Sequence, residues 1–148
     1  MKLVLSVFVA IFWLSGPTFA DTVLPDINLE AANAHCQKQW TKRGELDFEM
    51  HEYCMDGQIE GYSEALELSV LYGQQPWLEQ LIAFAFDKWT DRDMIQYDMT
   101  GYTLKGETEG FLDIEYALKN GDVTQEAVEV CKSEWFPQFS MVSYCLDL

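Results

Sequence analysis

The chain has 148 residues and is strongly acidic, with 25 Asp and Glu against 9 Lys and Arg, so its formal net charge is −16 at pH 7. Such a surface repels the phosphates of nucleic acid and the headgroups of anionic lipid, which excludes both as expected partners. It favours basic proteins or cations as partners, although a strong net charge also serves solubility alone. The length suffices for one domain with a hydrophobic core.

Residues 1–20 have the pattern of a secretory signal peptide. Lys2 precedes an apolar run over residues 3–14, and small residues around Ala20 form a cleavage site. The run is shorter than the roughly 20 residues that a membrane-spanning helix needs. We therefore predict cleavage after Ala20, a single domain over residues 21–148 and no later membrane span. The expected localisation is periplasmic or secreted, in a bacterium.

A pattern of cysteine, tryptophan, methionine and tyrosine recurs along the chain. The first copy consists of Cys36, Trp40, Phe48, Met50, Tyr53 and Cys54. The last copy consists of Cys131, Trp135, Phe139, Met141, Tyr144 and Cys145. A weaker middle copy has Trp89, Met94 and Tyr97, with Ala85 and Asp98 in place of cysteines. The three tryptophans recur at nearly equal intervals, which indicates an internal repeat of structural units.

Four cysteines in a short exported chain predict two disulfides, for which three pairings exist. The repeat favours Cys36–Cys54 and Cys131–Cys145, because each bond then closes its own unit and the middle copy lacks both members. A loop of about 18 residues closed in this way contributes about 3 kcal/mol in the chain-entropy account. Such bonds persist in the oxidising compartments to which exported proteins go.

The hydrophobic periodicity predicts helices, and no segment alternates for long enough to predict a strand. The predicted fold class is all-α, a bundle of about six helices built from three helical-hairpin repeats, two of them disulfide-stapled. The expected units cover residues 28–72, 76–119 and 123–148. Asp26 or Asn28 caps the first helix, residues 41–45 form a turn, and the helix at 76–89 is the centre of the core. A capping box of Thr90 and Asp93 starts the fourth helix, a break interrupts it near Gly106, and Asp122 caps the fifth.

The helix predicted over residues 46–72 has apolar residues on two opposite sides, which predicts packing on both. One apolar stripe contains Phe48, Met55, Ile59, Tyr62, Leu66 and Val70. The other contains Met50, Cys54, Gly57, Gly61, Ala65, Leu68 and Tyr72, and its small residues allow a neighbouring backbone to approach closely. Between them lies the acidic stripe, our candidate partner surface, which consists of Glu49, Glu52, Asp56, Glu60 and Glu67.

The large side chains of the repeats are expected to fill the small core of each hairpin rather than to form a ligand box. This predicted repeat core consists of Trp40, Met50, Tyr53, Trp89, Met94, Tyr97, Trp135, Met141 and Tyr144.

The search for catalytic chemistry yields no catalytic residue, metal ligand or cofactor. His51 and Glu52 resemble a zinc-peptidase signature, but Met55 stands where the second histidine is required. The aspartates at 87, 91, 93 and 98 resemble a calcium loop, yet Arg92 takes the place of the necessary glycine. No serine lies in a strand-turn-helix elbow and no glycine-rich phosphate loop occurs.

The repeated Cys-x-x-x-Trp and Met-x-x-Tyr-Cys elements resemble those of small exported bacterial helical proteins, which implies a helical fold and export but no activity. Residues 53–61 are also similar to a cysteine-glycine helix in periplasmic immunity proteins that neutralise cell-wall amidases delivered by type VI secretion. This second resemblance suggests a role as an immunity factor and transfers no functional residues.

The sequence therefore favours an exported, non-catalytic helical module that binds another protein, as an inhibitor or immunity factor for a basic partner. The alternatives are a cell-wall hydrolase that uses a carboxylate pair and a small-ligand or cation-binding periplasmic protein. The sequence leaves the partner's identity and homo-oligomerisation open.

Overall fold

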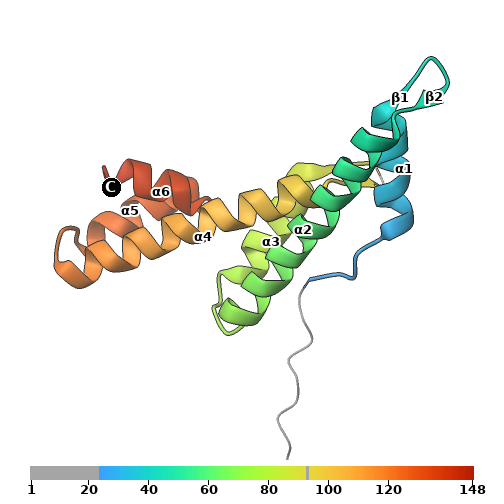
Figure 1. The fold of residues 1–148 in the computed structure, drawn as a ribbon. Helices are drawn as coiled ribbons and strands as arrows, with labels where there is room; N and C mark the ends of the chain where they lie inside the picture. Colours follow the sequence, from blue (N-terminus) through green and yellow to red (C-terminus); the bar gives the residue numbers. More distant parts are fainter. Residues whose placement is uncertain (1–23, 93) are drawn as a thin grey trace, which may run out of the picture.

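The computed structural model describes residues 24–92 and 94–148, so the predicted signal peptide and Asp93 lie outside the described residues. These residues form an all-α fold with two small β-hairpins (Figure 1). The helices are α1 (Leu29–Trp40), α2 (Phe48–Tyr72), α3 (Leu78–Trp89), α4 (Tyr97–Asn120), α5 (Gln125–Trp135) and α6 (Phe139–Cys145). The strands are β1 (Thr41–Lys42), β2 (Glu45–Leu46), β3 (Thr90–Asp91) and β4 (Met94–Ile95). The predicted fold class is confirmed.

The helices pair into three consecutive units: α1 with α2, α3 with α4, and α5 with α6. From the start of α1 to the start of α2, every boundary of the first unit recurs in the second unit at one constant shift, so that Leu29 matches Leu78 and Phe48 matches Tyr97. We call this shift, which also separates Trp40 from Trp89, the repeat offset. The third unit has a shorter connection, because α6 begins four residues after Trp135 whereas α4 begins eight residues after Trp89. The internal repeat is therefore present in the structure as well as in the sequence.

Each of the first two units turns through a β-hairpin. In the first, Thr41 pairs with Leu46 and Lys42 with Glu45, so the predicted turn at 41–45 is a tight hairpin. Arg43 and Gly44 have φ of 56° and 85°, and a two-residue hairpin turn of type I′ requires positive φ at both central positions. In the second, β3 and β4 pair at the equivalent positions.

The start of α4 differs from the prediction. Thr90 belongs to β3 and its side chain donates to the carbonyl of Phe86, so it does not begin the fourth helix. The helix begins instead at Tyr97, after the hairpin. A hairpin strand of two residues is too short to leave an alternating pattern, which is why the sequence did not indicate it.

Local signals set the other helix ends. The Asn28 side chain accepts from the amide of Ala31 and caps α1, as one of the two predicted alternatives requires. Gly121, in the left-handed conformation, ends α4. Thr124 rather than Asp122 caps α5, since its hydroxyl accepts from the amide of Ala127.

The predicted break near Gly106 is absent, and α4 is one continuous helix of 24 residues. It packs against α2 and α3 along its first part and against α6 further on, as Figure 1 shows. These contacts along its length outweigh the destabilising effect of its glycines, because tertiary packing supplies most helical stability in proteins. Helix α4 thus connects the end of the molecule that carries α1 and α2 to the end that carries α5 and α6.

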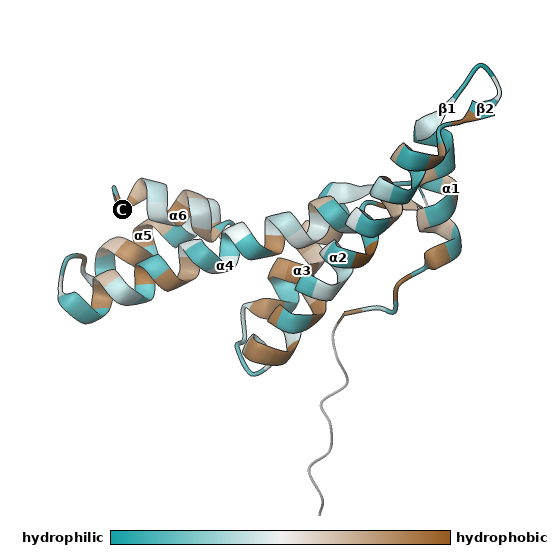
Figure 2. Cartoon of the chain, viewed as in Figure 1, coloured by the Kyte–Doolittle hydropathy of each residue, from teal (hydrophilic) through white to brown (hydrophobic). Residues whose placement is uncertain are grey.

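The core follows the apolar surface of α3, as predicted, and the apolar residues of this helix are brown in Figure 2. Leu78, Leu81, Ile82 and Ala85 are all buried. Just before α3, the ring of Trp77 lies 4.6 Å from that of Phe111 on α4 and 5.2 Å from that of Phe139 on α6, measured between centroids. This aromatic cluster joins the second unit to the third.

Helix α2 packs on one side only, so the prediction of two packed faces is wrong. Its stripe of small residues faces the protein, and Gly61 and Ala65 are buried there. In the opposite stripe, Phe48, Ile59, Leu66 and Val70 are exposed. Met55 and Tyr62 are half-buried, and the Tyr62 ring lies 5.7 Å from that of Tyr97. The helical pattern alone cannot show which of two apolar faces a neighbour covers.

The predicted repeat core is correct for the tryptophans, which are partly buried, and wrong for two of the tyrosines. Tyr53 and Tyr144 are 73% and 78% exposed, whereas Tyr97 is 1% exposed. Met50, Met94 and Met141 are half-buried.

The repeat offset explains this disparity, because it matches Met50 and Tyr53 with Met99 and Tyr102 rather than with Met94 and Tyr97. Tyr102 is 72% exposed, like its counterparts in the other two units. The tyrosine of the repeat is therefore a surface residue in all three units.

Candidate functional site

The units join through a side chain on one long helix that reaches the first turn of the next unit's second helix. Gln58 of α2 is buried, and its Oε1 accepts from the amide of Tyr97 at 2.8 Å. Its Nε2 donates to Oδ1 of Asp98 at 2.9 Å. One amide side chain thus satisfies a backbone donor at the start of α4, where helix amides have no intrahelical acceptor, and a neighbouring carboxylate.

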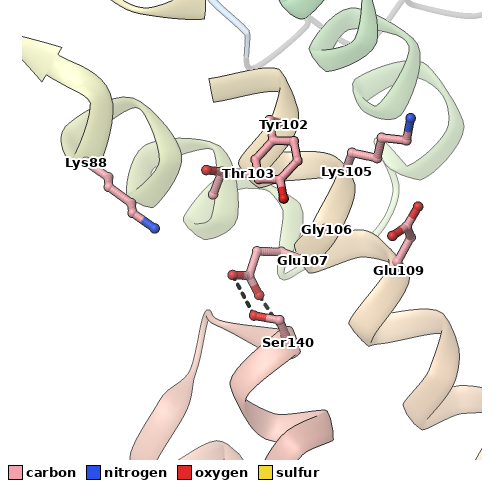
Figure 3. Close-up of a pocket in the computed structure, with 8 residues that line it drawn as sticks. All are labelled: Lys88, Tyr102, Thr103, Lys105, Gly106, Glu107, Glu109 and Ser140. Carbon is pink, nitrogen blue, oxygen red and sulfur yellow. Dashed lines mark hydrogen bonds between the residues drawn. The ribbon is translucent and has the colours of Figure 1, made fainter. Parts of the chain in front are cut away.

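Glu107 occupies the place on α4 that the repeat offset matches with Gln58 on α2. Its two carboxylate oxygens accept from the amide of Ser140 at 2.8 Å and from the hydroxyl of Ser140 at 2.9 Å. Figure 3 shows both hydrogen bonds between α4 and the first turn of α6. The second and third units are therefore joined by the same device as the first and second.

Two glycines allow the backbones to approach at these joints. A Cβ on Gly61 would lie 2.6 Å from the carbonyl carbon of Tyr97, and one on Gly110 would lie 2.7 Å from that of Phe139. Gly61 and Gly110 are again related by the repeat offset, and each follows its polar partner by three positions. The joint is therefore a Gln-x-x-Gly or Glu-x-x-Gly element on one helix against the start of another.

The hollow shown in Figure 3 lies beside the second joint and has a volume of about 350 Å³. Lys88 points toward it and lies over the rings of Phe84 and Trp89, at 5.6 Å and 5.4 Å from their centroids. Glu107, the only buried carboxylate among the residues that the structure describes, is engaged by Ser140 on both oxygens. Two polar residues of this hollow, Glu107 and Ser140, are thus bonded to each other across the joint.

The acidic stripe keeps its predicted position on α2. The five side chains Glu49, Glu52, Asp56, Glu60 and Glu67 are all exposed. The open apolar stripe of Phe48, Ile59, Leu66 and Val70 runs beside it. Spacing predicted each row, but only the structure shows that both face solvent together. We call the two rows combined the open face of α2.

Both predicted disulfides are present. Cys36 is bonded to Cys54 and Cys131 to Cys145, and these bonds link the two helices of the first and third units. In the second unit the equivalent positions are Ala85 and Thr103, not Ala85 and Asp98. The indole Nε1 of Trp89 donates to the Thr103 hydroxyl at 2.7 Å, so a hydrogen bond lies where the other units have a covalent one. Disulfides are typical of proteins in non-reducing surroundings.

The histidines are not grouped for metal binding. His51 Nε2 lies 3.0 Å from the side-chain oxygen of Asn33 and thereby joins α2 to α1. Within the described part of the chain, no three His, Cys, Asp or Glu side chains are arranged to hold a metal ion. Over the same residues, no helix has both the length and the apolar content needed to cross a bilayer.

Comparisons of the chain with protein-family models, with curated proteins and with solved structures find no match.

Sequence reasoning missed Gln58, Glu107 and the special position of Phe48. One signal could have found Gln58 and Glu107. The Gln58-x-x-Gly61 and Glu107-x-x-Gly110 elements recur at the same spacing that separates Trp40 from Trp89. A polar residue fixed in this way relative to a repeat is a candidate for contact between repeats, because neighbouring repeats bury a continuous core.

Proposed function

We propose that this protein is an exported, non-catalytic module that binds another protein through the open face of α2. The exposure of Phe48 supports this proposal, since its counterparts Tyr97 and Phe139 are buried against a preceding unit. An apolar row on one element, bordered by charged residues, is typical of a protein interaction surface. Two disulfides accord with export to a non-reducing compartment, the periplasm or the exterior of a bacterial cell.

The charge of the surface indicates the sign of the partner. The five carboxylates of the acidic stripe lie along one side of the apolar row, and the whole chain has a formal charge of −16. A partner with a basic patch gains both faster association and correct orientation from such a field. An inhibitor or immunity factor for a basic enzyme is the role that best suits these properties.

The test is capture of a partner from the native host by the full chain, purified with its disulfides intact. The variant Glu52→Lys with Asp56→Lys reverses charge on the open face, and Glu126→Lys with Glu134→Lys reverses two exposed acids on α5 as a matched control. We expect the first variant to weaken binding by about tenfold or more and the control to change it by less than about twofold. Binding should also fall as salt rises.

Equal binding of both variants would contradict the use of the open face. A zymogram on peptidoglycan tests the alternative of a carboxylate-dependent cell-wall hydrolase, and clearing there would contradict a non-catalytic role. A thermal shift with calcium, retained in the Glu52→Lys and Asp56→Lys variant, would favour a cation carrier instead.

A further inference from the structure

The first residue of the second helix has different surroundings in the three units. Tyr97 is 1% exposed and Phe139 is 2% exposed, and in each case the preceding unit contributes to the cover. The Tyr97 ring packs against Tyr62 of α2, and the Phe139 ring packs against Trp77 and against Phe111 of α4. Phe48, the same position in the first unit, is 77% exposed. An aromatic residue is therefore kept at a docking position that no described part of this chain occupies.

The difference extends over three turns of helix. Leu104 and Thr108 are buried on α4, whereas the residues that the repeat offset matches with them on α2 are Met55, which is half-buried, and Ile59, which is exposed. Further along, the exposed Leu66 and Val70 take the places of polar residues on α4, Glu115 and Lys119. The first unit is thus more apolar on its open side than the second unit is at the same positions, which favours cover by a partner.

At each joint, the hydrogen-bonding side chain of the long helix complements the residue that it contacts, a donor against an acceptor. Asp98 is an acceptor, and it meets the amide donor of Gln58. Ser140 is a donor, and it meets the carboxylate of Glu107. Glu49 stands at this position in the first unit, so the side chain that docks there must donate, as Gln, Lys or Arg does.

The docking helix must also be small at one point. Gly61 and Gly110 each contact the backbone of the first two residues of a second helix, α4 and α6 respectively. The matching backbone positions on α2 belong to Phe48 and Glu49. Gly101, which contacts Gly61 at the first joint, is matched by Glu52 in the first unit and by Ser143 in the third. Ser143 is buried although it has a side chain. A residue with a Cβ is therefore compatible with docking, and the carboxylate of Glu52 adds a preference for a basic neighbour.

We propose that the open face of α2 receives an α-helix of another protein, in the way that α4 receives α2 and α6 receives α4. This helix carries a donor side chain, a glycine three residues later, and basic residues beside the acidic stripe. A second copy of this chain does not fit, because its own Gln58 and Gly61 are engaged by α4. The inference rests on the proposed function and specifies the class of partner.

The experiment uses a defined probe, an Ala- and Lys-based peptide that carries Leu on one face and the element Gln-x-x-Gly. A length of about 18 residues makes such a peptide long enough to form a helix in water. Two control peptides replace the Gln by Glu or the Gly by Leu, and circular dichroism establishes that all three are helical. Each peptide is titrated into the full chain, labelled for NMR, up to about 1 mM, which detects affinities of about 4 kcal/mol.

We expect saturable shifts at the amides of Phe48, Glu49 and Ile59. The Glu peptide should bind about fivefold less tightly, because its carboxylate meets Glu49, and the variant Glu49→Ser should remove this penalty by reproducing the pairing of Ser140 with Glu107. The Leu peptide, whose charge equals that of the first, should bind about tenfold less tightly, since it cannot approach the backbone. Binding to the far end of the molecule, equal binding of all three peptides or no shifts at all would overturn the proposal.

This outcome is separable from that of the proposed function, because the peptides involve no natural partner. A natural partner lost on charge reversal at Glu52 and Asp56, together with peptides that bind elsewhere or not at all, would retain the function and reject the helix. Selective peptide binding with no natural partner in the host would instead support the docking geometry and reject the function.

Discussion

The first and second units have the same helices and strands in the same order and with the same spacing, yet they are stabilised differently. The second unit lies between two neighbours, one of which packs on Tyr97 at the start of α4 while the other bonds to Glu107 further along this helix. In the described structure it has no disulfide. Among the described residues the first unit has one neighbouring unit, leaves Phe48 exposed and has its two helices joined by Cys36–Cys54. The third unit also has a single neighbouring unit in the described structure and a disulfide.

The difference shows where covalent and non-covalent stabilisation are used in this molecule. A unit between two neighbours gains burial on both sides, which is the usual source of stability in stacked repeats. An outer unit lacks one of these interfaces, and a disulfide compensates by lowering the entropy of the unfolded chain. The matched positions of the two units allow this comparison to be tested residue by residue.

The largest expected effect comes from removing the buried aromatic side chain at Tyr97, compared with the exposed one at the matching position, Phe48. Tyr97→Ala removes edge contacts with the rings of Tyr62 and Phe86 and the hydroxyl that accepts from the amide of Asn28. We expect it to lower the free energy of unfolding by about 4 kcal/mol, the usual cost of losing a buried aromatic ring. Phe48→Ala at the matched position should change it by about 0.5 kcal/mol or less. Guanidinium unfolding measures both, and similar losses would contradict the difference in cover.

The second prediction concerns a variant in which the two cysteines of the first unit are replaced by the residues at the matching positions of the second unit. The double substitution Cys36→Ala and Cys54→Thr reproduces Ala85 and Thr103. We expect a loss of about 3 kcal/mol of stability from the removed cross-link. The matched double substitution Cys131→Ala and Cys145→Thr should cost a similar amount.

These losses are measured as free energies of unfolding, from the denaturant midpoint and the slope together, because removing a cross-link expands the unfolded chain and raises the slope. A change below about 1 kcal/mol in both variants would mean that the disulfides do not replace the missing interfaces.

The third prediction concerns the joint between the units. Gly61→Ala places a Cβ against the carbonyl carbon of Tyr97 and should destabilise the protein by about 2 kcal/mol, since helix backbone must shift to admit it. Gly106→Ala is the control, because its added Cβ meets nothing within 4 Å and a helix-interior glycine is replaced by a better helix former. This control should gain about 0.5 to 1 kcal/mol. Thermal unfolding followed by circular dichroism would show the two variants moving in opposite directions.

The smallest effect tests the hydrogen bond that replaces a disulfide in the middle unit. Thr103→Val keeps the shape of the side chain but removes the acceptor for Nε1 of Trp89. We expect a loss of about 1 kcal/mol, the net contribution of one partly buried hydrogen bond. Tyr102→Phe, at the exposed neighbouring position, should leave stability unchanged. An indistinguishable midpoint for both variants would show that this bond contributes nothing to the second unit.

Much of the fold could be predicted because the relevant signals are local. The pairing of the cysteines followed from two copies that each contain both partners. The cap of α1 was narrowed to Asp26 or Asn28, because a capping side chain acts on amides within one helical turn. The continuity of α4 could not be predicted in this way, because the contacts that outweigh its glycines come from α2 and α6.

The register of the middle unit was accessible but ambiguous. Two Met-x-x-Tyr elements lie there, one at Met94 and one at Met99, and sequence similarity alone does not choose between them. The structure chooses the second, because β3 and β4 occupy the stretch that contains Met94. A constant spacing of ten residues from Trp40 to Met50 and from Trp89 to Met99 carries the same information in the sequence.

The candidate site was predicted only in part. The acidic stripe lies where the period of an α-helix puts it, on one side of α2. The exposure of the apolar row beside it could not be foreseen, because an apolar stripe with a neighbour and one without have the same sequence pattern.

The sequence by itself determined the helices, the repeat, the disulfides and the charge of this protein. The helices and disulfides depend on residues that interact within one unit, and the repeat and the charge are properties of the sequence alone. Only the tertiary structure decided which faces are covered. Phe48, Tyr97 and Phe139 take the same position in three similar units, but their burial depends on whether a neighbouring unit covers them in the structure, and that information is not contained in the residue itself. The open face of α2 is consequently a property of the stacking, and it is where we expect the partner to bind.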